Sequence, residues 1–178
     1  MKVEPLPLAG VLSISPRVFT DGRGFFIETY RASAYQDLGI TDVFVQDNHS
    51  RSVQNTVRGM HFQRSPGQAK LLRVVSGRIL DVVVDIRASS PTFGRWHSVE
   101  LDATEHRQLF VPVGFAHGFC VLSEVADVLY KVSSPYDPAT EVGFAWNDPD
   151  VGIDWPITDP ILSARDREAP AMREVVKR

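Results

Sequence analysis

Short β-strand patterns follow one another through most of the chain and leave little room for helices. Aromatic and β-branched residues are concentrated in RGFFIETY (23–30), and further strand patterns occur in DVFVQDN, WHSVEL, RQLFVPV, HGFCVL and DVLYKV. The stretch LLRVVSGRILDVVVDIR (71–87) predicts two strands joined at Ser76-Gly77, because glycine supplies the backbone freedom that a tight turn requires. Turn sequences such as SSPTFG and DPAT separate these patterns. Many short strands at this spacing predict an all-β sandwich or barrel that can hold a ligand between its sheets.

Helical patterns are few. RASAYQDLG (31–39) favours two helical turns that end near Gly39. The tail after Trp155 is rich in proline and is expected to be irregular, apart from a short helix near residues 170–175. No internal repeat, low-complexity tract or linker interrupts the chain, so we expect one domain over residues 1–178.

Composition excludes several classes of partner. The chain has 178 residues, of which 43% are hydrophobic, and a net charge of −3, so neither nucleic acid nor a membrane surface is expected as a partner. No segment approaches the ~20 apolar residues that span a bilayer, and the N-terminal MKVEPLPLAG lacks the apolar run of a signal peptide. We therefore expect a cytoplasmic protein. The single cysteine, Cys120, excludes an internal disulfide and lies among apolar neighbours, which predicts a buried, inert thiol.

Three polar residues interrupt the apolar pattern of VRGMHFQRSPGQAKLL (57–72). They are Arg58, His61 and Lys70. Arg58 and His61 are three positions apart and would face opposite sides of a regular strand. Both reach one pocket only if the strand bends or bulges, and Gly59 is the residue that permits this. An anionic ligand would then be attracted by this local cluster and not by the weakly acidic protein as a whole.

The spacing of the polar residues resembles the cupin superfamily, whose members form a double-sheet jelly roll. His61 is followed by Gln63, Lys70 and Gly77, and a second motif, PVGFAH, ends at His117. In metal-binding cupins the first motif supplies His-x-His and a Glu, and the second supplies another His. Gln63 and Lys70 replace two of those ligands here, and an ammonium group repels a divalent cation. The resemblance implies a cupin double-stranded β-helix with short peripheral helices, and we expect neither a metal nor another cofactor.

The pair that replaces the metal ligands has a chemistry of its own. The imidazole of a histidine such as His61 can act as a base, while the Lys70 ammonium can stabilise a developing negative charge. Such a pair suits abstraction of a proton next to a carbonyl group: the imidazole takes the carbon-bound proton and the ammonium stabilises the enolate oxygen.

A longer series of motifs resembles the dTDP-4-dehydrorhamnose 3,5-epimerase family. The motifs are TDGRGFFIETY, VQDNHS, VRGMHFQ, DVVVDIR, SPTFGRW, VPVGFAHGF, LYKVSSPY, WNDPDVGIDWP and LSARD, in family order from about residue 16 to residue 166. The resemblance implies epimerisation of dTDP-4-dehydro-6-deoxy-D-glucose at ring carbons 3 and 5, which gives dTDP-4-dehydro-L-rhamnose for dTDP-L-rhamnose biosynthesis. It also implies a homodimer with exchanged N-terminal strands.

Residue roles follow from the matching motifs. The resemblance implies that His61 is the general base, that Asp166 orients it, that Tyr130 delivers a proton from the opposite face of the sugar ring, and that Lys70 holds the keto oxygen. It implies a further set of substrate-binding residues: Arg23, Glu28, Gln46, Asp47, Asn48, Arg58, His117, Tyr136, Glu141 and Arg165. Arginines suit a diphosphate because the planar guanidinium bonds two oxygens at once.

Two other functions remain open at this point. Relatives in antibiotic-sugar pathways epimerise only one carbon with nearly the same residues, and the motifs do not separate them from the 3,5-epimerases; a ketoisomerase of the same substrate belongs to this second enzyme alternative. A nucleotide-sugar-binding cupin without catalysis is the third possibility, although His61, Lys70 and Tyr130 together argue against it.

Overall fold

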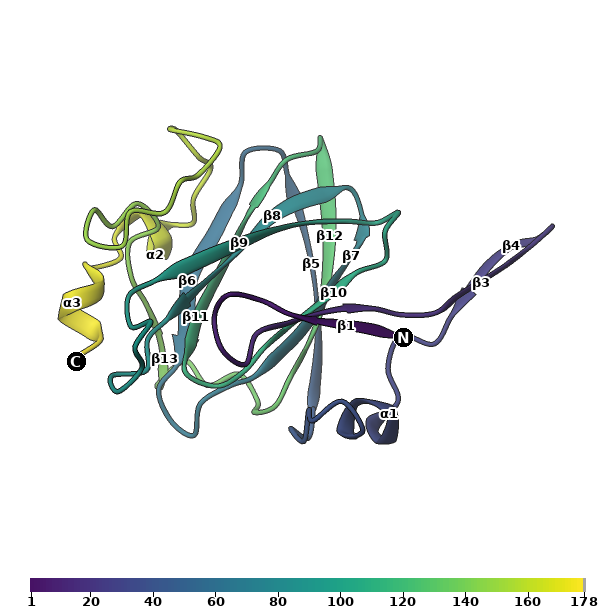
Figure 1. Cartoon of the computed structure of the whole chain (residues 1–178). Coiled ribbons are helices and arrows are strands. Elements are labelled where there is room, and N and C mark those ends of the chain that lie inside the picture. Colours follow the sequence, from purple (N-terminus) through teal and green to yellow (C-terminus); the bar gives the residue numbers. More distant parts are fainter. Residues whose placement is uncertain (178) are drawn as a thin grey trace.

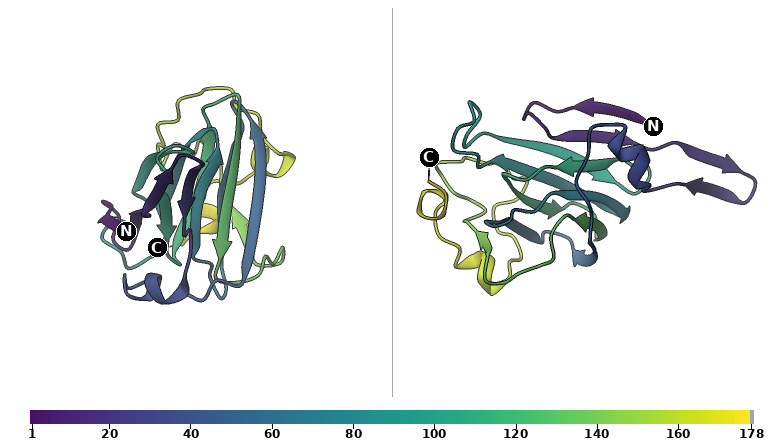
Figure 2. Two further views of the ribbon diagram at one scale, coloured as in Figure 1. Left: turned by 90° about the vertical axis from the view of Figure 1, so that its right-hand side faces the viewer. Right: turned by 90° about the horizontal axis from the view of Figure 1, so that it is seen from below.

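Two antiparallel β-sheets face each other in the computed structural model of the chain, which describes residues 1–177 (Figures 1 and 2). The six-stranded sheet has the order β1 (Lys2–Pro5), β2 (Leu12–Ser15), β10 (Gln108–Val111), β7 (Lys70–Ser76), β12 (Val125–Val132) and β5 (Gln46–Val53). The five-stranded sheet has the order β13 (Glu141–Gly143), β6 (Val57–Gln63), β11 (Phe115–Val121), β8 (Arg78–Asp85) and β9 (Trp96–Asp102). The predicted all-β double-sheet fold is confirmed.

The turn at Ser76-Gly77 joins the two sheets. The sequence predicts the position correctly, and Gly77 has a φ of +75°. A side chain there would bring its Cβ within 2.0 Å of the Val125 carbonyl oxygen, so only glycine fits. The two strands that it connects do not pair with each other, because β7 pairs with β10 and β12 while β8 pairs with β9 and β11.

The main hydrophobic core fills the space between the sheets. Inward-facing side chains alternate along each strand, and Leu72 and Val74 of β7 meet Ile79 and Val83 of β8 within one buried cluster. Burial of such side chains stabilises the fold by roughly 1.5–3 kcal/mol each. The same inward face of β7 begins with Lys70, so one end of the interior is polar.

A second core covers the outer face of the five-stranded sheet. Val82 and Val84 of β8 point outward there and are buried by Phe144, Trp155 and Met172 of the C-terminal segment. That segment carries two short helices, α2 (Ala164–Arg167) and α3 (Met172–Val175). The predicted helix near residues 170–175 is confirmed, whereas α2 was not predicted, since LSARD reads as part of an irregular tail. Strand β8 is therefore buried on both faces.

The predicted N-terminal helix is shorter than expected. It forms α1 (Ala32–Gln36), which covers the outer face of the six-stranded sheet through Tyr35, and Gly39 follows with a φ of +84°. The strand predicted from DVFVQDN begins only at Gln46, because residues 42–45 are irregular. Among the described residues, no helix is long and apolar enough to cross a bilayer.

A two-stranded hairpin projects from the body of the protein (Figures 1 and 2). Its strands are β3 (Val18–Asp21) and β4 (Gly24–Ile27), which pair only with each other. Phe25 and Phe26 are 62% and 68% exposed on it. Two large aromatic side chains exposed in series on a projecting element are unusual for a free surface.

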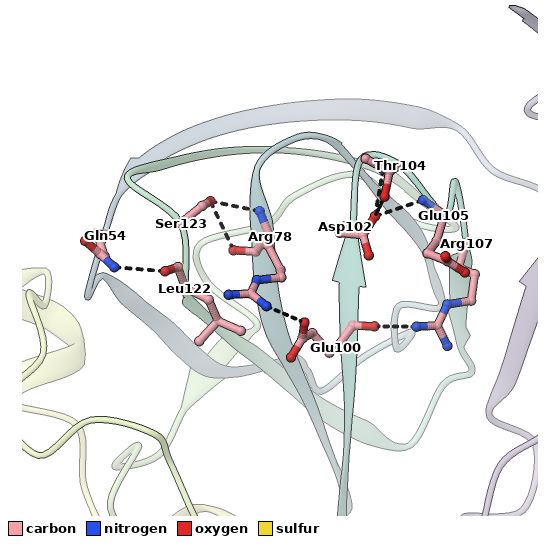
Figure 3. A network of polar contacts seen from close by, with 9 residues as sticks. All are labelled: Gln54, Arg78, Glu100, Asp102, Thr104, Glu105, Arg107, Leu122 and Ser123. Carbon is pink, nitrogen blue, oxygen red and sulfur yellow. Dashed lines mark hydrogen bonds and ion pairs between the residues drawn. The ribbon is translucent and has the colours of Figure 1, made fainter.

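Hydrogen bonds and an ion pair stabilise several of the turns between strands (Figure 3). Asp102 at the end of β9 accepts hydrogen bonds from the backbone N–H groups of Thr104 and Glu105, which closes the turn toward β10. Arg78 pairs with Glu100 across β8 and β9 at 3.0 Å, and its backbone N–H donates to Ser123 Oγ at 2.8 Å. These contacts hold the starts and ends of the core strands in register.

Candidate active site

A cavity of about 640 Å³ opens at the polar end of the space between the sheets. Strands β5, β7 and β12 of the six-stranded sheet line one side, and β6 and β11 of the five-stranded sheet line the other. Residues 161–166 of the C-terminal segment close part of its wall. A pocket of this size accommodates a small organic ligand.

A bulge in β6 turns both of its polar side chains into the cavity. Gly59 has a φ of +130°, and the pairing of β6 with β11 shifts register between His117 and Phe119. Arg58 and His61 therefore both line the cavity, as the sequence predicts. A Cβ at Gly59 would lie 2.6 Å from the backbone Cα of Gly118, so the two strands approach too closely for any side chain.

His61 is paired with a carboxylate. Its Nε2 lies 2.6 Å from Oδ1 of Asp166, which is buried in α2. Ser163 caps this helix by accepting a hydrogen bond from the Asp166 backbone N–H. Burial raises the pKa of Asp166, but the bonds from His61 and the Gly59 backbone outweigh it and leave this pKa below its ordinary value. An ionised Asp166 accepts a hydrogen bond from the Nε2–H of His61 and leaves Nδ1 as the basic nitrogen.

A second histidine–carboxylate pair lies beside the first. His117 of β11 is directly opposite His61 of β6 in the sheet. Its Nε2 lies 2.8 Å and 3.0 Å from the two carboxylate oxygens of Asp81 on β8. His117 lines the cavity, whereas Asp81 is completely buried behind it.

Sequence reasoning missed Asp81. In RILDVVVDIR the alternation places Asp81 and Asp85 opposite Val82 and Val84, which would normally mean that the carboxylates face solvent. Here the C-terminal segment buries the valine face, and the aspartate face points into the sandwich. The available signal was the strongly apolar character of the strand, which is typical of strands buried on both faces.

Lys70 enters the cavity from the opposite sheet. Its side chain is nearly buried, and Nζ lies 3.5 Å from the backbone oxygen of His61. Burial lowers the pKa of Lys70 to about 8, and the negative charges of Glu141 and Asp81 oppose this shift. The group is therefore a cation at neutral pH that loses its proton in mildly alkaline solution.

Tyr130 also belongs to the six-stranded sheet. It lies in β12 and lines the cavity. Burial raises the pKa of its phenol above the ordinary value, and the charge of Arg58 opposes the shift. The phenol thus retains its proton at neutral pH. Because His61 comes from one sheet and Tyr130 from the other, a ligand between the sheets is approached by the two groups from different sides.

Most of the predicted binding residues line the same cavity. Arg58 is held by a 2.9 Å hydrogen bond from its Nε to Ser52 Oγ. Five others that line it are Asn48, His117, Tyr136, Glu141 and Arg165. Arg165 is ion-paired with Glu141, and Tyr136 is half exposed at the rim. Gln46 does not line the cavity, but its side chain bonds Asn48 Oδ1 at 2.8 Å and the Tyr136 backbone N–H at 3.1 Å, so it supports two residues that do.

Three predicted binding residues lie elsewhere within this chain. Arg23 is in the projecting hairpin and pairs with Asp21, and Glu28 pairs with Arg31 just beyond it. Asp47 points to the outer face of β5 and pairs with Lys131 at 2.8 Å. None of the three lines the cavity of its own chain.

The residues at the cupin metal positions have other partners. Gln63 donates to the backbone oxygen of Pro135 at 3.2 Å and accepts from Gln68 at 3.3 Å. Within residues 1–177, no three His, Cys, Asp or Glu side chains are grouped so that they could hold a metal ion. Cys120 is buried, and burial raises the pKa of its thiol to about 11, as expected for an inert cysteine.

Comparison with known proteins places the chain beside nucleotide-sugar enzymes. The family model described as dTDP-4-dehydrorhamnose 3,5-epimerase matches residues 5–174. The dTDP-4-dehydrorhamnose 3,5-epimerase of Salmonella typhimurium is 49% identical and aligns over 99% of this chain and 98% of its own. The crystal structure of the Legionella pneumophila 3,5-epimerase in complex with dTDP-4-keto-L-rhamnose is 42% identical, with a TM-score of 0.95 over 99% and 97% of the two chains.

A relative with a different activity is also similar. The dTDP-4-dehydrorhamnose 3-epimerase of Streptomyces niveus is 42% identical over 98% of this chain and 85% of its own. Similarity at this level is therefore compatible with epimerisation at one carbon or at two.

Proposed function

The chain belongs to the dTDP-4-dehydrorhamnose 3,5-epimerase family, a group of cupin jelly-roll enzymes, and from this premise we propose how its cavity acts. The protein is an isomerase that inverts carbons 3 and 5 of dTDP-4-dehydro-6-deoxy-D-glucose to give dTDP-4-dehydro-L-rhamnose in dTDP-L-rhamnose biosynthesis. The observation that carries the mechanism is the convergence of His61, Lys70 and Tyr130 on one cavity from two facing sheets.

His61 removes the carbon-bound proton. Both reacting carbons flank the 4-keto group, so loss of either proton gives an enolate. Asp166 at 2.6 Å holds the imidazole with Nε2 protonated and stabilises the imidazolium that forms. A positioned base of this kind contributes roughly 10²–10⁴-fold to the rate.

Lys70 stabilises the enolate. The ammonium is almost fully withdrawn from water, so its attraction for the developing oxyanion is little screened. This charge replaces the function that a metal ion would serve in another cupin, and the proposed chemistry requires no cofactor.

Tyr130 returns a proton to the opposite face. Inversion requires this arrangement, because a proton returned to the face from which it was taken regenerates the substrate. The two sheets provide the two faces, since His61 belongs to one sheet and Tyr130 to the other. Before the cycle is repeated at the second carbon, the His61 imidazolium releases its proton to solvent and the Tyr130 phenolate takes one up from solvent.

The nucleotide is bound at the open side of the cavity. Arg58 and Arg165 are suited to bind the diphosphate through paired hydrogen bonds. Tyr136, half exposed at the rim, is placed to stack on the base, and Asn48 supplies an amide next to it. The clustered guanidinium groups give a local positive field in a protein whose net charge is −3.

The working unit is a homodimer. Two facts support this proposal: Phe25 and Phe26 are exposed on the projecting hairpin, and the hairpin carries Arg23, with Glu28 following it, away from the chain's own cavity. Exchange of the N-terminal strands would bury the aromatic rings and bring Arg23 and Glu28 to the partner's cavity. Sedimentation analysis should give a dimer, and a fully active monomer would contradict this arrangement.

Deuterium exchange tests the reaction. In D₂O, proton NMR should show loss of the signals at both carbon 3 and carbon 5 of the substrate. Exchange at only one of the two carbons would identify the single-carbon epimerase, a displaced keto group would identify the ketoisomerase, and binding of dTDP without exchange would identify a non-catalytic protein.

A pair of histidine variants tests the assigned base. His61→Ala should abolish exchange while leaving dTDP binding largely intact. His97→Ala is the matched control, because His97 lies in β9 and does not line the cavity. Exchange in the His61→Ala variant at the wild-type rate would refute the assignment.

A further inference from the structure

We propose that Asp81 is a positioning residue of this active site, where its buried carboxylate selects the tautomer of His117 and maintains Lys70 as a cation. The inference rests on the epimerase function proposed above. It concerns a residue that does not line the cavity and acts only through two residues that do.

The geometry of the pair defines the tautomer of His117. Both carboxylate oxygens of Asp81 lie within 3.0 Å of His117 Nε2, and a carboxylate accepts hydrogen bonds but does not donate them. The Nε2 nitrogen therefore carries a proton, and in the neutral ring Nδ1 is the nitrogen left free to accept a hydrogen bond. A neutral His117 then accepts a hydrogen bond from a hydroxyl group of the sugar. The same logic holds for His61 and Asp166, so the two imidazoles present the same nitrogen.

A purely structural role does not account for the carboxylate. Asp81 is 0% exposed, and its neighbours on the inward face of β8, Ile79 and Val83, belong to the hydrophobic core. Withdrawing a carboxylate from water costs several kcal/mol, and replacing a buried ion pair by apolar side chains often leaves stability unchanged or higher. The hydrogen-bond partner of Asp81 is a cavity residue, His117, so its contribution is directed to the cavity.

The charge of Asp81 also acts on Lys70. Burial lowers the pKa of Lys70, and Asp81 is one of the two carboxylates whose charge opposes that shift. The other ionisable groups around the cavity are the acidic Glu141 and Asp166, the histidines His61 and His117, the phenols Tyr130 and Tyr136, and the cations Arg51, Arg58 and Arg165. Among the three carboxylates, Asp166 is bonded to His61 and Glu141 is ion-paired with Arg165. Asp81 is the one bonded to His117.

Removing the charge of Asp81 should shift the pH–rate profile in a defined direction. Without Asp81, the protonated form of Lys70 is less stable, so the pKa of Lys70 falls further and the cation is lost at lower pH. Epimerisation needs that cation, so the alkaline limb of the pH–rate profile moves toward lower pH. A merely structural residue would change the amount of folded protein and leave the profile where it is.

Two isosteric variants on one strand make the test. Asp81→Asn and Asp85→Asn each remove a completely buried carboxylate from β8, but Asp85 is bonded to Arg87, Ser90 and Thr92 outside the cavity. Deuterium exchange into the substrate is measured from pH 6 to pH 10, with dTDP affinity measured in parallel. For Asp81→Asn we expect the alkaline limb to move to lower pH and kcat to fall roughly tenfold, with dTDP affinity almost unchanged. Asp85→Asn should lower Tm and leave the profile in place.

The wild-type protein supplies a second readout that does not depend on folding of a variant. In protein labelled with ¹⁵N in histidine, the His117 signal, assigned through a His117→Asn variant, should show a protonated Nε2 and an unprotonated Nδ1 at pH 8. A wild-type profile in Asp81→Asn, or a protonated Nδ1 in neutral His117, would overturn the inference. Absence of exchange in the wild-type enzyme would instead refute the proposed function, and the nitrogen spectrum would still decide the role of Asp81.

Discussion

His61 Nε2 lies 2.6 Å from a carboxylate oxygen of Asp166, although 105 positions separate the two residues in the chain. Hydrogen bonds between backbones produce this contact: Ile161 donates to the Asn55 oxygen at 2.8 Å and accepts from the Val57 N–H at 3.1 Å. The tail is thus fixed to the start of β6, and α2 follows immediately with Asp166 pointing at the histidine. The base is part of the sheet, while the residue that orients it belongs to the C-terminal segment outside the sheet.

The first prediction concerns this pair. Asp166→Asn should lower kcat by roughly 10²–10⁴-fold, because an amide no longer favours the tautomer in which Nδ1 is basic. Deuterium exchange into the substrate measures the effect. The control is Ser163→Ala, which removes the cap of α2 and should cost about 1 kcal/mol of stability with a much smaller loss of rate. Equal losses of rate in the two variants would show that Asp166 acts only by holding the tail in place.

The second prediction is a pH dependence of activity. Burial lowers the pKa of Lys70 to about 8. Activity should therefore fall as pH rises through about 8, since the ammonium that stabilises the enolate loses its proton. Lys70→Met should be inactive across the range, while Lys131→Met, which removes an ammonium paired with Asp47 on the outer face, should keep the alkaline limb. Activity that stays constant up to pH 10 would contradict the role of Lys70.

The third prediction is that the Lys70 contribution to stability rises with pH, whereas activity falls. Between about pH 8 and the ordinary pKa of 10.5, the unfolded chain binds the Lys70 proton and the folded protein does not. The unfolded state then binds more protons, so the free energy of unfolding rises with pH. Between these pH values the free energy of unfolding of the wild type should rise by on the order of 3 kcal/mol relative to that of Lys70→Met, which lacks the titrating group. Urea unfolding of both proteins at pH 8 and pH 10.5 measures this change. An equal change in the free energy of unfolding of the two proteins between these pH values would contradict the prediction.

The fourth prediction concerns the bulge in β6. Gly59→Ala places a Cβ 2.6 Å from the Gly118 backbone at a φ of +130°, so it combines backbone strain with a steric conflict between two strands. We expect a loss of about 2–5 kcal/mol of stability and a loss of activity through displacement of His61. Gly94→Ala also has a positive φ, but no atom lies within 4 Å of its Cβ, so it should cost only about 1 kcal/mol. Thermal unfolding of both variants gives the comparison, and equal Tm values would contradict it.

The fifth prediction concerns the single cysteine. Burial raises the pKa of the Cys120 thiol to about 11 and withholds it from solvent. Iodoacetamide at pH 8 should therefore leave the folded protein unmodified and alkylate it in urea, as mass spectrometry would show. Rapid alkylation of the native protein, or loss of activity with it, would mean that the thiol is accessible.

Metal removal provides a further check on the chemistry. Dialysis against EDTA should leave the rate of deuterium exchange unchanged, because Gln63 and Lys70 stand where metal-binding cupins carry ligands. Restoration of a lost rate by added zinc or iron would contradict the assigned role of Lys70.

Local patterns predicted much of this protein. Alternating patterns and β-branched residues predicted most of the core strands, and a glycine predicted the turn at residue 77. The bend at Gly59 followed from the requirement that Arg58 and His61 share a pocket, and the structure confirms it. These features were predictable because they depend on residues within a few positions of one another.

The sequence alone determined the strand content, the motif that links the chain to its family, and the chemical character of His61, Lys70 and Tyr130. Only the tertiary structure decided which of two aspartates on β8 serves the cavity: Asp81 contacts His117, while Asp85 fastens a loop. It also decided that Arg23, Glu28 and Asp47 lie away from the cavity of their own chain. The physical reason is that alternation tells which side chains share a face of a strand, whereas the packing of distant segments decides what each face meets.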